Sequence, residues 1–187
     1  MFNKTKDFGP VNLMVDLETL STNPEARVLS AGMVHFDKRG IIGTGRYLEL
    51  SQSEQKDREV LNSTLDWWKT QPVPVPDKGT DSIYKLFVAL DEMYVEGGTI
   101  WSQSSMDTEI IKNLAKDYRL NIAWPHWKVR DSRTFRNELS ELGVDWGIVP
   151  PTKHHALTDA QVQADHVAYM QRQVEDKFKK KFWQFWK

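Results

Sequence analysis

The chain has 187 residues, of which 40% are hydrophobic and 27% are charged. This length suits one domain with its own core, and the hydrophobic fraction excludes wholesale disorder. The absence of cysteine excludes disulfide scaffolds, thiolate metal sites and cysteine nucleophiles. The 25 basic and 26 acidic side chains give a net charge of −1, so composition alone does not point to nucleic acid.

Two further features bear on where the protein works. No apolar run approaches the roughly 20 residues that a membrane-spanning helix needs. The first residues, MFNKTKDFGPVNL, lack the apolar stretch of a secretory signal peptide. We therefore expect a cytoplasmic protein with no membrane partner.

The first fifty residues predict three strands. The apolar run at 11–16 is typical of a buried strand. Residues 27–36 predict a central strand, and a turn at 37–40 joins it to an antiparallel partner at 41–50. Small residues on one face of the central strand indicate that another part of the chain packs closely there. Strict alternation assigns to that face Val28, Ser30, Gly32 and Val34.

Two helices are predicted in the middle of the chain. Residues 57–70 predict the first, and three prolines between 72 and 76 end it and impose an extended linker. Residues 82–96 predict the second, because apolar residues recur there at helical spacing. These apolar residues occupy positions 83, 86, 87, 90, 93 and 94.

The rest of the chain alternates between strands and helices. The predicted elements cover residues 99–103, 106–120, 127–132, 133–142 and 157–182. The order β-β-β-α-α-β-α-β-α-α predicts an α/β fold with a mixed five-stranded sheet flanked by helices. We expect a single domain over 1–187, with 171–187 as a basic and aromatic C-terminal helix.

Acidic residues follow two of the predicted strands. Asp16 and Glu18 are two residues apart at the end of the first strand, so both carboxylates lie on one face. Such neighbours repel unless a cation lies between them, and hard oxygen ligands select Mg²⁺ or Mn²⁺. An ordinary solvent-facing strand end is the alternative for an isolated pair. Asp107 begins a helix after another strand, where an acid also serves simply as a cap.

The segment HHALTDAQVQA adds a histidine and a fourth acid. His154 precedes the last helix, and Asp159 lies about one turn inside it. Several carboxylates with a histidine are what two-metal phosphodiester hydrolysis requires, because the metals activate a water and a base takes its proton. A zinc site formed by His154, His155 and His166 is the weaker alternative, since the adjacent His154 and His155 point apart and no second ligand pair has the spacing.

Three motifs, in this order, resemble the DEDDh family of 3′→5′ exonucleases: VDLETLS, SQSSMDTEII and HHALTDAQVQA. TLDWWKTQP and VRDSRT are similar to a narrower group, which contains T-even phage exonuclease A and small exoribonucleases of the mycobacterial RNase AS type. The likeness covers about residues 11–170, with Met106 where the family usually has phenylalanine. It implies a ribonuclease H-like fold, two Mg²⁺ or Mn²⁺ ions per active site and a bacterial or phage-infected cell.

The resemblance also assigns roles to five residues. It implies that Asp16, Glu18 and Asp159 hold the metal that activates water. Asp16 then bridges to a second metal, which Asp107 supports directly or through water. His154 matches the general base of the family, whereas His155 matches no catalytic position.

Substrate contacts are expected next to the first motif and on the first helix. The resemblance implies that Leu17, through its backbone, and Thr19, through its hydroxyl or amide, contact the terminal sugar. Trp67 and Trp68 point about 100° apart on a helix. We therefore expect one of them in the core, while the other stacks on a base.

Two basic segments leave more than one interpretation open. Arg130 and Arg133 are candidates for phosphate contact, with a structural ion-pair cluster around Asp131 as the alternative. The C-terminal helix at 171–187 carries lysines and aromatic residues. We expect it to dock on the domain or on a second subunit, which would give a homodimer, ahead of contact with nucleic acid or a membrane surface.

The sequence therefore predicts a metal-dependent 3′→5′ exonuclease that acts on the 3′ ends of single-stranded DNA or RNA and releases nucleoside 5′-monophosphates. The alternatives are a ribonuclease H-like endonuclease and a catalytically silent nucleic-acid-binding module of the same fold. No residue identified in the sequence reads the 2′-hydroxyl group, so DNA and RNA stay open.

Overall fold

A computed structural model describes residues 10–145, 147 and 154–184, and for 179–184 it describes the backbone alone. Two predictions concern residues outside this set. They are the N-terminal segment compared with a signal peptide and the aromatic side chains beyond Phe178. Across the described residues, no helix combines the length and the apolar character needed to cross a membrane.

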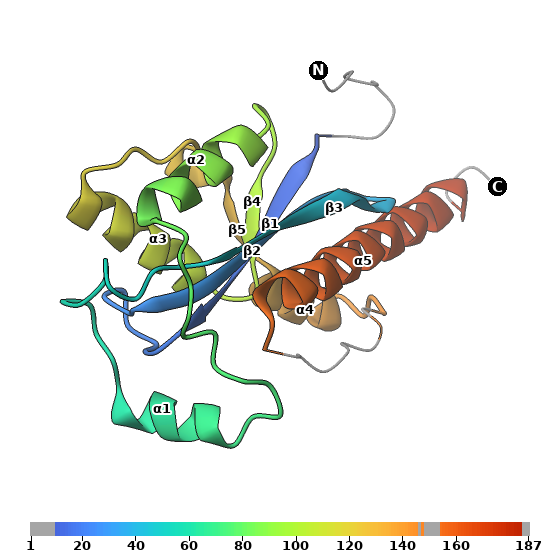
Figure 1. The fold of residues 1–187 in the computed structure, drawn as a ribbon. Helices are drawn as coiled ribbons and strands as arrows, with labels where there is room; N and C mark the ends of the chain where they lie inside the picture. The colour runs from blue at the N-terminus through green and yellow to red at the C-terminus, as the bar shows by residue number, and fades with distance from the viewer. Residues whose placement is uncertain (1–9, 146, 148–153, 185–187) are drawn as a thin grey trace.

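A mixed five-stranded sheet forms the centre of the molecule (Figure 1). Its order is β3-β2-β1-β4-β5, in which the first three strands are antiparallel neighbours and the last two run parallel to β1. The predicted α/β architecture is therefore confirmed. The strands are β1 (Asn12–Thr19), β2 (Val28–Asp37), β3 (Gly40–Glu49), β4 (Ile100–Ser102) and β5 (Val129–Asp131).

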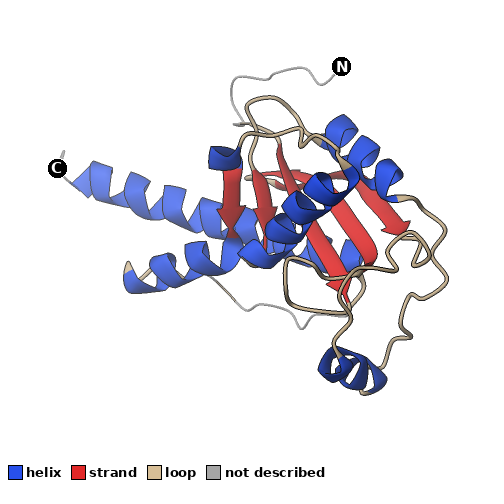
Figure 2. Ribbon diagram, turned by 90° about the vertical axis from the view of Figure 1, so that its left-hand side faces the viewer, coloured by secondary structure: helices blue, strands red, loops and turns tan. Residues whose placement is uncertain are grey.

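Helices cover both faces of this sheet (Figure 2). α2 and α3 share a hydrophobic core with one face, and α4 and α5 share a core with the other. α1 lies at the periphery between two long connections (Figure 1). The helices are α1 (Asn62–Lys69), α2 (Ile83–Met93), α3 (Ser105–Tyr118), α4 (Ser132–Glu141) and α5 (Ala156–Gln184), with a 3₁₀ turn at His126–Lys128.

β1 is buried on both sides because helices cover both faces of the sheet. Leu17 packs in the core beneath α2 and α3, whereas Met14 packs in the core beneath α4 and α5. Strand alternation puts Asp16 and Glu18 on the same side as Met14, toward α5. The strand continues to Thr19, so both acids lie within regular pairing to β2 rather than beyond its end.

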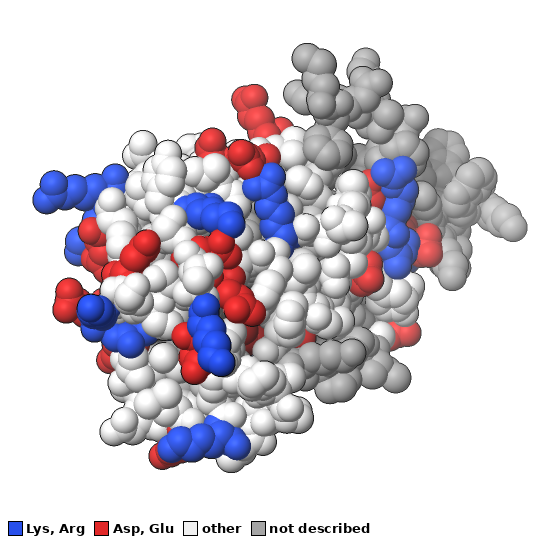
Figure 3. Space-filling view, in the orientation of Figure 1, with Lys and Arg blue, Asp and Glu red and all other residues white. Residues whose placement is uncertain are grey.

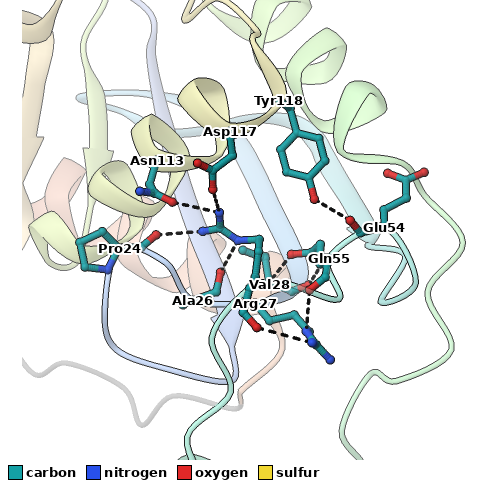
Figure 4. Close-up of polar contacts among 10 residues, drawn as sticks. Pro24, Ala26, Arg27, Val28, Glu54, Gln55, Asn113, Asp117 and Tyr118 are labelled. Carbon is teal, nitrogen blue, oxygen red and sulfur yellow. Dashed lines mark hydrogen bonds and ion pairs between the residues drawn. The ribbon is translucent and has the colours of Figure 1, made fainter.

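The helix predicted over 57–70 is wrong at its start, because α1 begins only at Asn62. The preceding backbone lies instead along the residues just before β2, where Ala26 and Glu59 form a parallel bridge. The buried guanidinium of Arg58 holds this connection in place through hydrogen bonds. Its hydrogen-bond acceptors, which Figure 4 labels, are the carbonyls of Pro24 and Ala26 and the side chains of Asn113 and Asp117.

The pattern predicted for β2 is wrong at one residue. Glu18 pairs with Ser30, but Thr19 pairs with Val28, so the ladder is irregular at Leu29. Such a bulge breaks the alternation of side chains. Val28 therefore joins the core beneath α2 and α3 instead of lying with Ser30 on the opposite face.

α5 continues without interruption from the sheet to Gln184, and its far half contacts the end of α4. The Lys177 ammonium group donates hydrogen bonds to the carbonyls of Leu142 and Gly143 at 2.6 and 2.7 Å. Phe178 beside it is exposed. The C-terminal segment thus docks on its own domain through at least this residue.

Candidate active site

Asp107 lies beside β1 although it is distant in sequence. β4 runs parallel to β1 and leads into α3, so the first turn of α3 begins at the edge of the sheet where β1 ends. There the Leu17 N–H donates to Asp107 Oδ1 at 3.1 Å. This bond ties the buried Asp107 carboxylate to the strand that carries Asp16 and Glu18.

A glycine on β2 lets α5 approach the same place. Gly32 is the partner of Asp16 in the β1–β2 ladder. A Cβ atom on Gly32 would lie 2.2 Å from the backbone of Ala156, the first residue of α5. The helix therefore starts directly against the sheet, and its first turn carries the buried Asp159. The close packing predicted for this face of β2 is confirmed.

His154 precedes α5 in a conformation that is unusual for a residue with a side chain. Its φ is +53°, in the left-handed region. The His154 N–H donates to Asp159 Oδ2 at 2.8 Å, which holds this conformation. Ligand atoms of Glu18, His154 and Asp159 all lie within 4.8 Å of one another. The fold thus gathers predicted catalytic residues from both ends of the chain.

Burial and mutual repulsion control the charge of these acids. Burial raises the pKa of Asp16 well above its usual range, and the nearby Asp107 and Glu18 raise it further. Burial also raises the pKa of Glu18 to about 8, with Asp159 and Asp107 adding repulsion. Burial raises the pKa of Asp107 to about 7, although the backbone N–H bonded to it opposes the rise. Without a cation, Asp16, Glu18 and Asp107 therefore favour protonated forms near neutral pH.

Two cavities meet at Glu18. The acid cavity, of about 370 Å³, is lined by the four carboxylates and His154 together with Gln103, Arg133 and Gln163. The aromatic cavity, of about 400 Å³, is lined mainly by hydroxyl and indole side chains. These are Thr19, Thr22, Ser63, Thr64, Trp67 and Trp68. Both cavities share Leu17, Glu18, Trp67 and Met106.

The two adjacent tryptophans have different environments, as their helical spacing predicts. Trp68 is 1% exposed, and its Nε1 donates to the Thr19 carbonyl at 2.9 Å. Trp67 is 42% exposed and meets the His154 ring edge-on, with the ring centroids 4.7 Å apart. Trp68 therefore supports the backbone of the aromatic cavity, whereas Trp67 presents an open ring between the two cavities.

The two candidate phosphate contacts are also separated. Arg133 lines the acid cavity, and its charge lowers the pKa of Asp107. Arg130 donates to two nearby backbone carbonyls and does not line either cavity. Asp131 caps α4 by accepting from backbone N–H groups. Within the described part of the chain no ion pair joins it to either arginine, so the alternative of an ion-pair cluster is wrong.

Comparison with protein families gives one match that covers most of the chain. The model of the 3′-5′ exoribonuclease Rv2179c-like domain matches residues 11–171. The chain belongs to this family. The resemblance to DEDDh 3′→5′ exonucleases is thereby confirmed, while the finer relation to the phage enzyme stays a prediction. A comparison with curated protein sequences gave no match.

Solved structures similar to this member of the exoribonuclease family include several of exonuclease I. E. coli exonuclease I in complex with a 5cy-dT13 oligonucleotide has a TM-score of 0.68 at 14% identity, covering 93% of this chain and 43% of that chain. The zinc-bound form of an E. coli exonuclease I complex with single-stranded DNA has a TM-score of 0.61 at 15% identity, covering 88% and 39%. The chain thus spans less than half the length of these proteins. The likeness shows a shared fold, and the expected ribonuclease H-like architecture is confirmed.

Two contacts at the site of this exoribonuclease-family chain were not predicted from the sequence. Gln163 Nε2 donates to Asp16 Oδ1 at 2.7 Å. The Tyr47 ring stacks on His155, with centroids 4.4 Å apart, and so holds the residue next to the predicted base. The spacing of four residues between Asp159 and Gln163 is a signal for a shared helix face. No comparable signal exists for Tyr47, because its place depends on the register of β3.

Proposed function

We propose that the protein is a metal-dependent 3′→5′ exonuclease that releases nucleoside 5′-monophosphates from single-stranded nucleic acid. The observation that carries this proposal is the convergence of four carboxylates and His154 on one cavity in a chain of an exoribonuclease family. A module that only bound nucleic acid would gain nothing from carboxylates that repel one another and the phosphate backbone. The family description makes RNA the first substrate to test.

The acid cavity suits divalent cations. Four carboxylates at one place are unfavourable unless positive charge accompanies them, and oxygen donors are the ligands that Mg²⁺ and Mn²⁺ prefer. We assign the ions to Asp16, Glu18 and Asp159, with Asp107 completing a second position. Two bound ions would supply an activated water and stabilise the charge that develops on the phosphate.

His154 is assigned as the general base that takes the proton from the attacking water. Its backbone is bonded to Asp159 and its ring is packed against Trp67, so both ends of the residue are held close to Glu18. A base fixed beside the acids needs no large movement to reach a water bound among them.

The aromatic cavity is proposed to receive the terminal nucleoside. Leu17 and Thr19 line it next to Glu18, and Trp67 offers an open ring on which a base can stack. Trp68 supports this cavity through Thr19 rather than through a ligand. Arg133 is the favoured phosphate contact, while Arg130 lies outside both cavities and its role stays a prediction.

The charge on one face of the molecule fits binding of nucleic acid through the two cavities and not through a broad basic surface. On the face in Figure 3, the described acidic and basic side chains are interspersed and do not gather into a broad basic surface. Exonuclease I, which shares the fold, is described with single-stranded DNA and in a zinc-bound form. A single exonuclease domain over 1–187, a homodimer and a cytoplasmic location stay predictions.

One experiment separates the exonuclease from its alternatives. Single-stranded RNA and DNA of equal sequence, labelled at the 5′ end, are incubated with the protein in Mg²⁺ or in EDTA, beside Asp16→Ala and His154→Ala. Stepwise shortening from the 3′ end that requires metal and Asp16 is the expected result. Internal cuts would indicate an endonuclease, and binding without cleavage would indicate a silent module.

A further inference from the structure

Among the described residues, only one end of the Gln163 amide has a hydrogen-bond partner. Its Nε2 donates to Asp16 Oδ1 at 2.7 Å. Its Oε1 is buried and accepts no hydrogen bond from the described residues. The residue is 7% exposed, so bulk solvent does not replace the missing donor. A buried acceptor without a partner is costly, and its retention here calls for a reason.

The chemistry of Asp16 fixes which way the amide points. With Asp16 ionised, as a metal ligand must be, an amide turned by 180° would place Oε1 against a carboxylate oxygen, and neither atom could donate. The N–H end must therefore face Asp16, and the acceptor end must face away from it. Among the described residues, Gln163 is the only side chain that donates to Asp16.

Gln163 has a second polar space beside it. Gln163 lines a small cavity of about 20 Å³ as well as the acid cavity. Donor side chains of α4 and α5 line that small cavity: Ser132, Arg133, Arg136 and His166. A water molecule needs a cavity of about 10–15 Å³ and two to four polar partners. The small cavity thus has the size and polarity to hold one water between Gln163 and these donors.

α5 delivers Gln163 to Asp16 with little freedom. Asp159 and Gln163 lie four residues apart and share one helix face. The contact of Ala156 with Gly32 sets the helix directly against the strand that pairs with Asp16. The amide therefore reaches Asp16 from a regular element that packs in the core, and not from a loop.

We propose that Gln163 is a positioning residue for Asp16. The amide N–H of Gln163 holds one oxygen of the Asp16 carboxylate and leaves the other oxygen free for the metal. The inference rests on the proposed function, since it needs Asp16 to be a metal ligand. Glu18, Asp107 and Asp159 repel the Asp16 carboxylate, and the hydrogen bond from Gln163 opposes this repulsion. Gln163 itself does not touch the reacting atoms.

The test measures Mn²⁺ binding to the full chain by calorimetry without nucleic acid. Gln163→Met keeps the length of the side chain and removes the donor. We expect at least about tenfold weaker Mn²⁺ binding, as for other groups that orient metal ligands. The matched control is Gln161→Met on the same helix. The Nε2 of Gln161 donates to the Thr44 carbonyl, away from the acids, so the Mn²⁺ affinity of this variant should equal that of the wild type.

A second readout follows cleavage of single-stranded RNA. For Gln163→Met we expect kcat to fall while KM changes by less than about twofold, because substrate contacts are intact. A wild-type Mn²⁺ affinity for this variant, with an active wild type, would overturn the inference and leave the proposed function standing. A wild type that neither binds Mn²⁺ nor cleaves would instead overturn the proposed function.

If the Gln163→Met variant does not fold, Gln163→Asn provides a second test of the same contact. It keeps the amide but withdraws it by one methylene group, so the donor no longer spans the distance to Asp16. The same loss of Mn²⁺ affinity is expected. Unchanged affinity in a folded Gln163→Asn protein would count against the positioning role.

Discussion

The acid cavity and the aromatic cavity differ in how they are built, although they are nearly equal in volume and share Glu18 and Trp67. The acid cavity takes its four carboxylates from β1 and from the first turns of α3 and α5, which pack in the two main cores. The aromatic cavity takes its indoles from α1, whose one buried residue is Trp68. The groups proposed to hold metal thus lie on core elements, and the groups proposed to contact a variable base lie at the periphery.

The largest expected effect tests the acid cavity. Asp159→Asn should lower kcat/KM by at least about 10²-fold, because it removes a negative charge from the proposed metal site. A metal bound there would stabilise the charge that develops on the phosphate by several kcal/mol. Cleavage of labelled single-stranded RNA in Mg²⁺ measures kcat/KM. The control is Asp165→Asn, an exposed acid on the same helix, which should behave as the wild type. An Asp159→Asn protein within tenfold of wild type would remove this residue from the proposed metal site.

A smaller effect is expected in the aromatic cavity. Trp67→Ala should raise KM for single-stranded RNA by about tenfold, since stacking of a base on an aromatic ring contributes about 1–3 kcal/mol. Because Trp67 also packs on His154, kcat should fall by a smaller factor. Trp127→Ala is the control, since Trp127 is 64% exposed and lies in the 3₁₀ turn before β5. If both variants raise KM equally, the cavity does not bind the base.

The smallest expected effect is on stability and also distinguishes the cavities. Burial raises the pKa of Glu18 from its usual 4.5 to about 8, so the folded protein holds more protons than the unfolded chain between these values. In EDTA, the free energy of unfolding should therefore fall as pH rises from about 4.5 to about 8. Mg²⁺, which binds the ionised form, should stabilise the protein more at pH 8 than at pH 5.

Thermal unfolding at both pH values measures this effect. Glu18→Gln should raise the melting temperature in EDTA at pH 8 by at least roughly 2–4 °C, because at least about 1 kcal/mol of repulsion and desolvation is removed. Trp67→Phe, in the aromatic cavity, should leave the pH dependence unchanged. A pH-independent melting temperature of the wild type in EDTA would show that the acids do not carry this linkage.

Most of the elements were predictable because their signals are local. The apolar stripe of α2 appears in the sequence as helical spacing, and the residues at 83, 86, 87, 90 and 93 are buried. The start of α1 was not predictable, because the bonds of Arg58 to distant carbonyls and to α3 hold residues 57–61 out of the helix. The bulge at Leu29 was missed for a related reason, since alternation assumes an unbroken ladder.

The sequence by itself determined the order of elements, the five catalytic candidates and the presence of one core and one open tryptophan in a pair. These follow from periodicity and motif spacing, which are properties of neighbouring residues. Only the tertiary structure decided that Gly32 admits α5, that Gln163 reaches Asp16, and that Arg133 rather than Arg130 faces the acids. Such contacts depend on strand register and on the distance between packed elements, which no local pattern encodes.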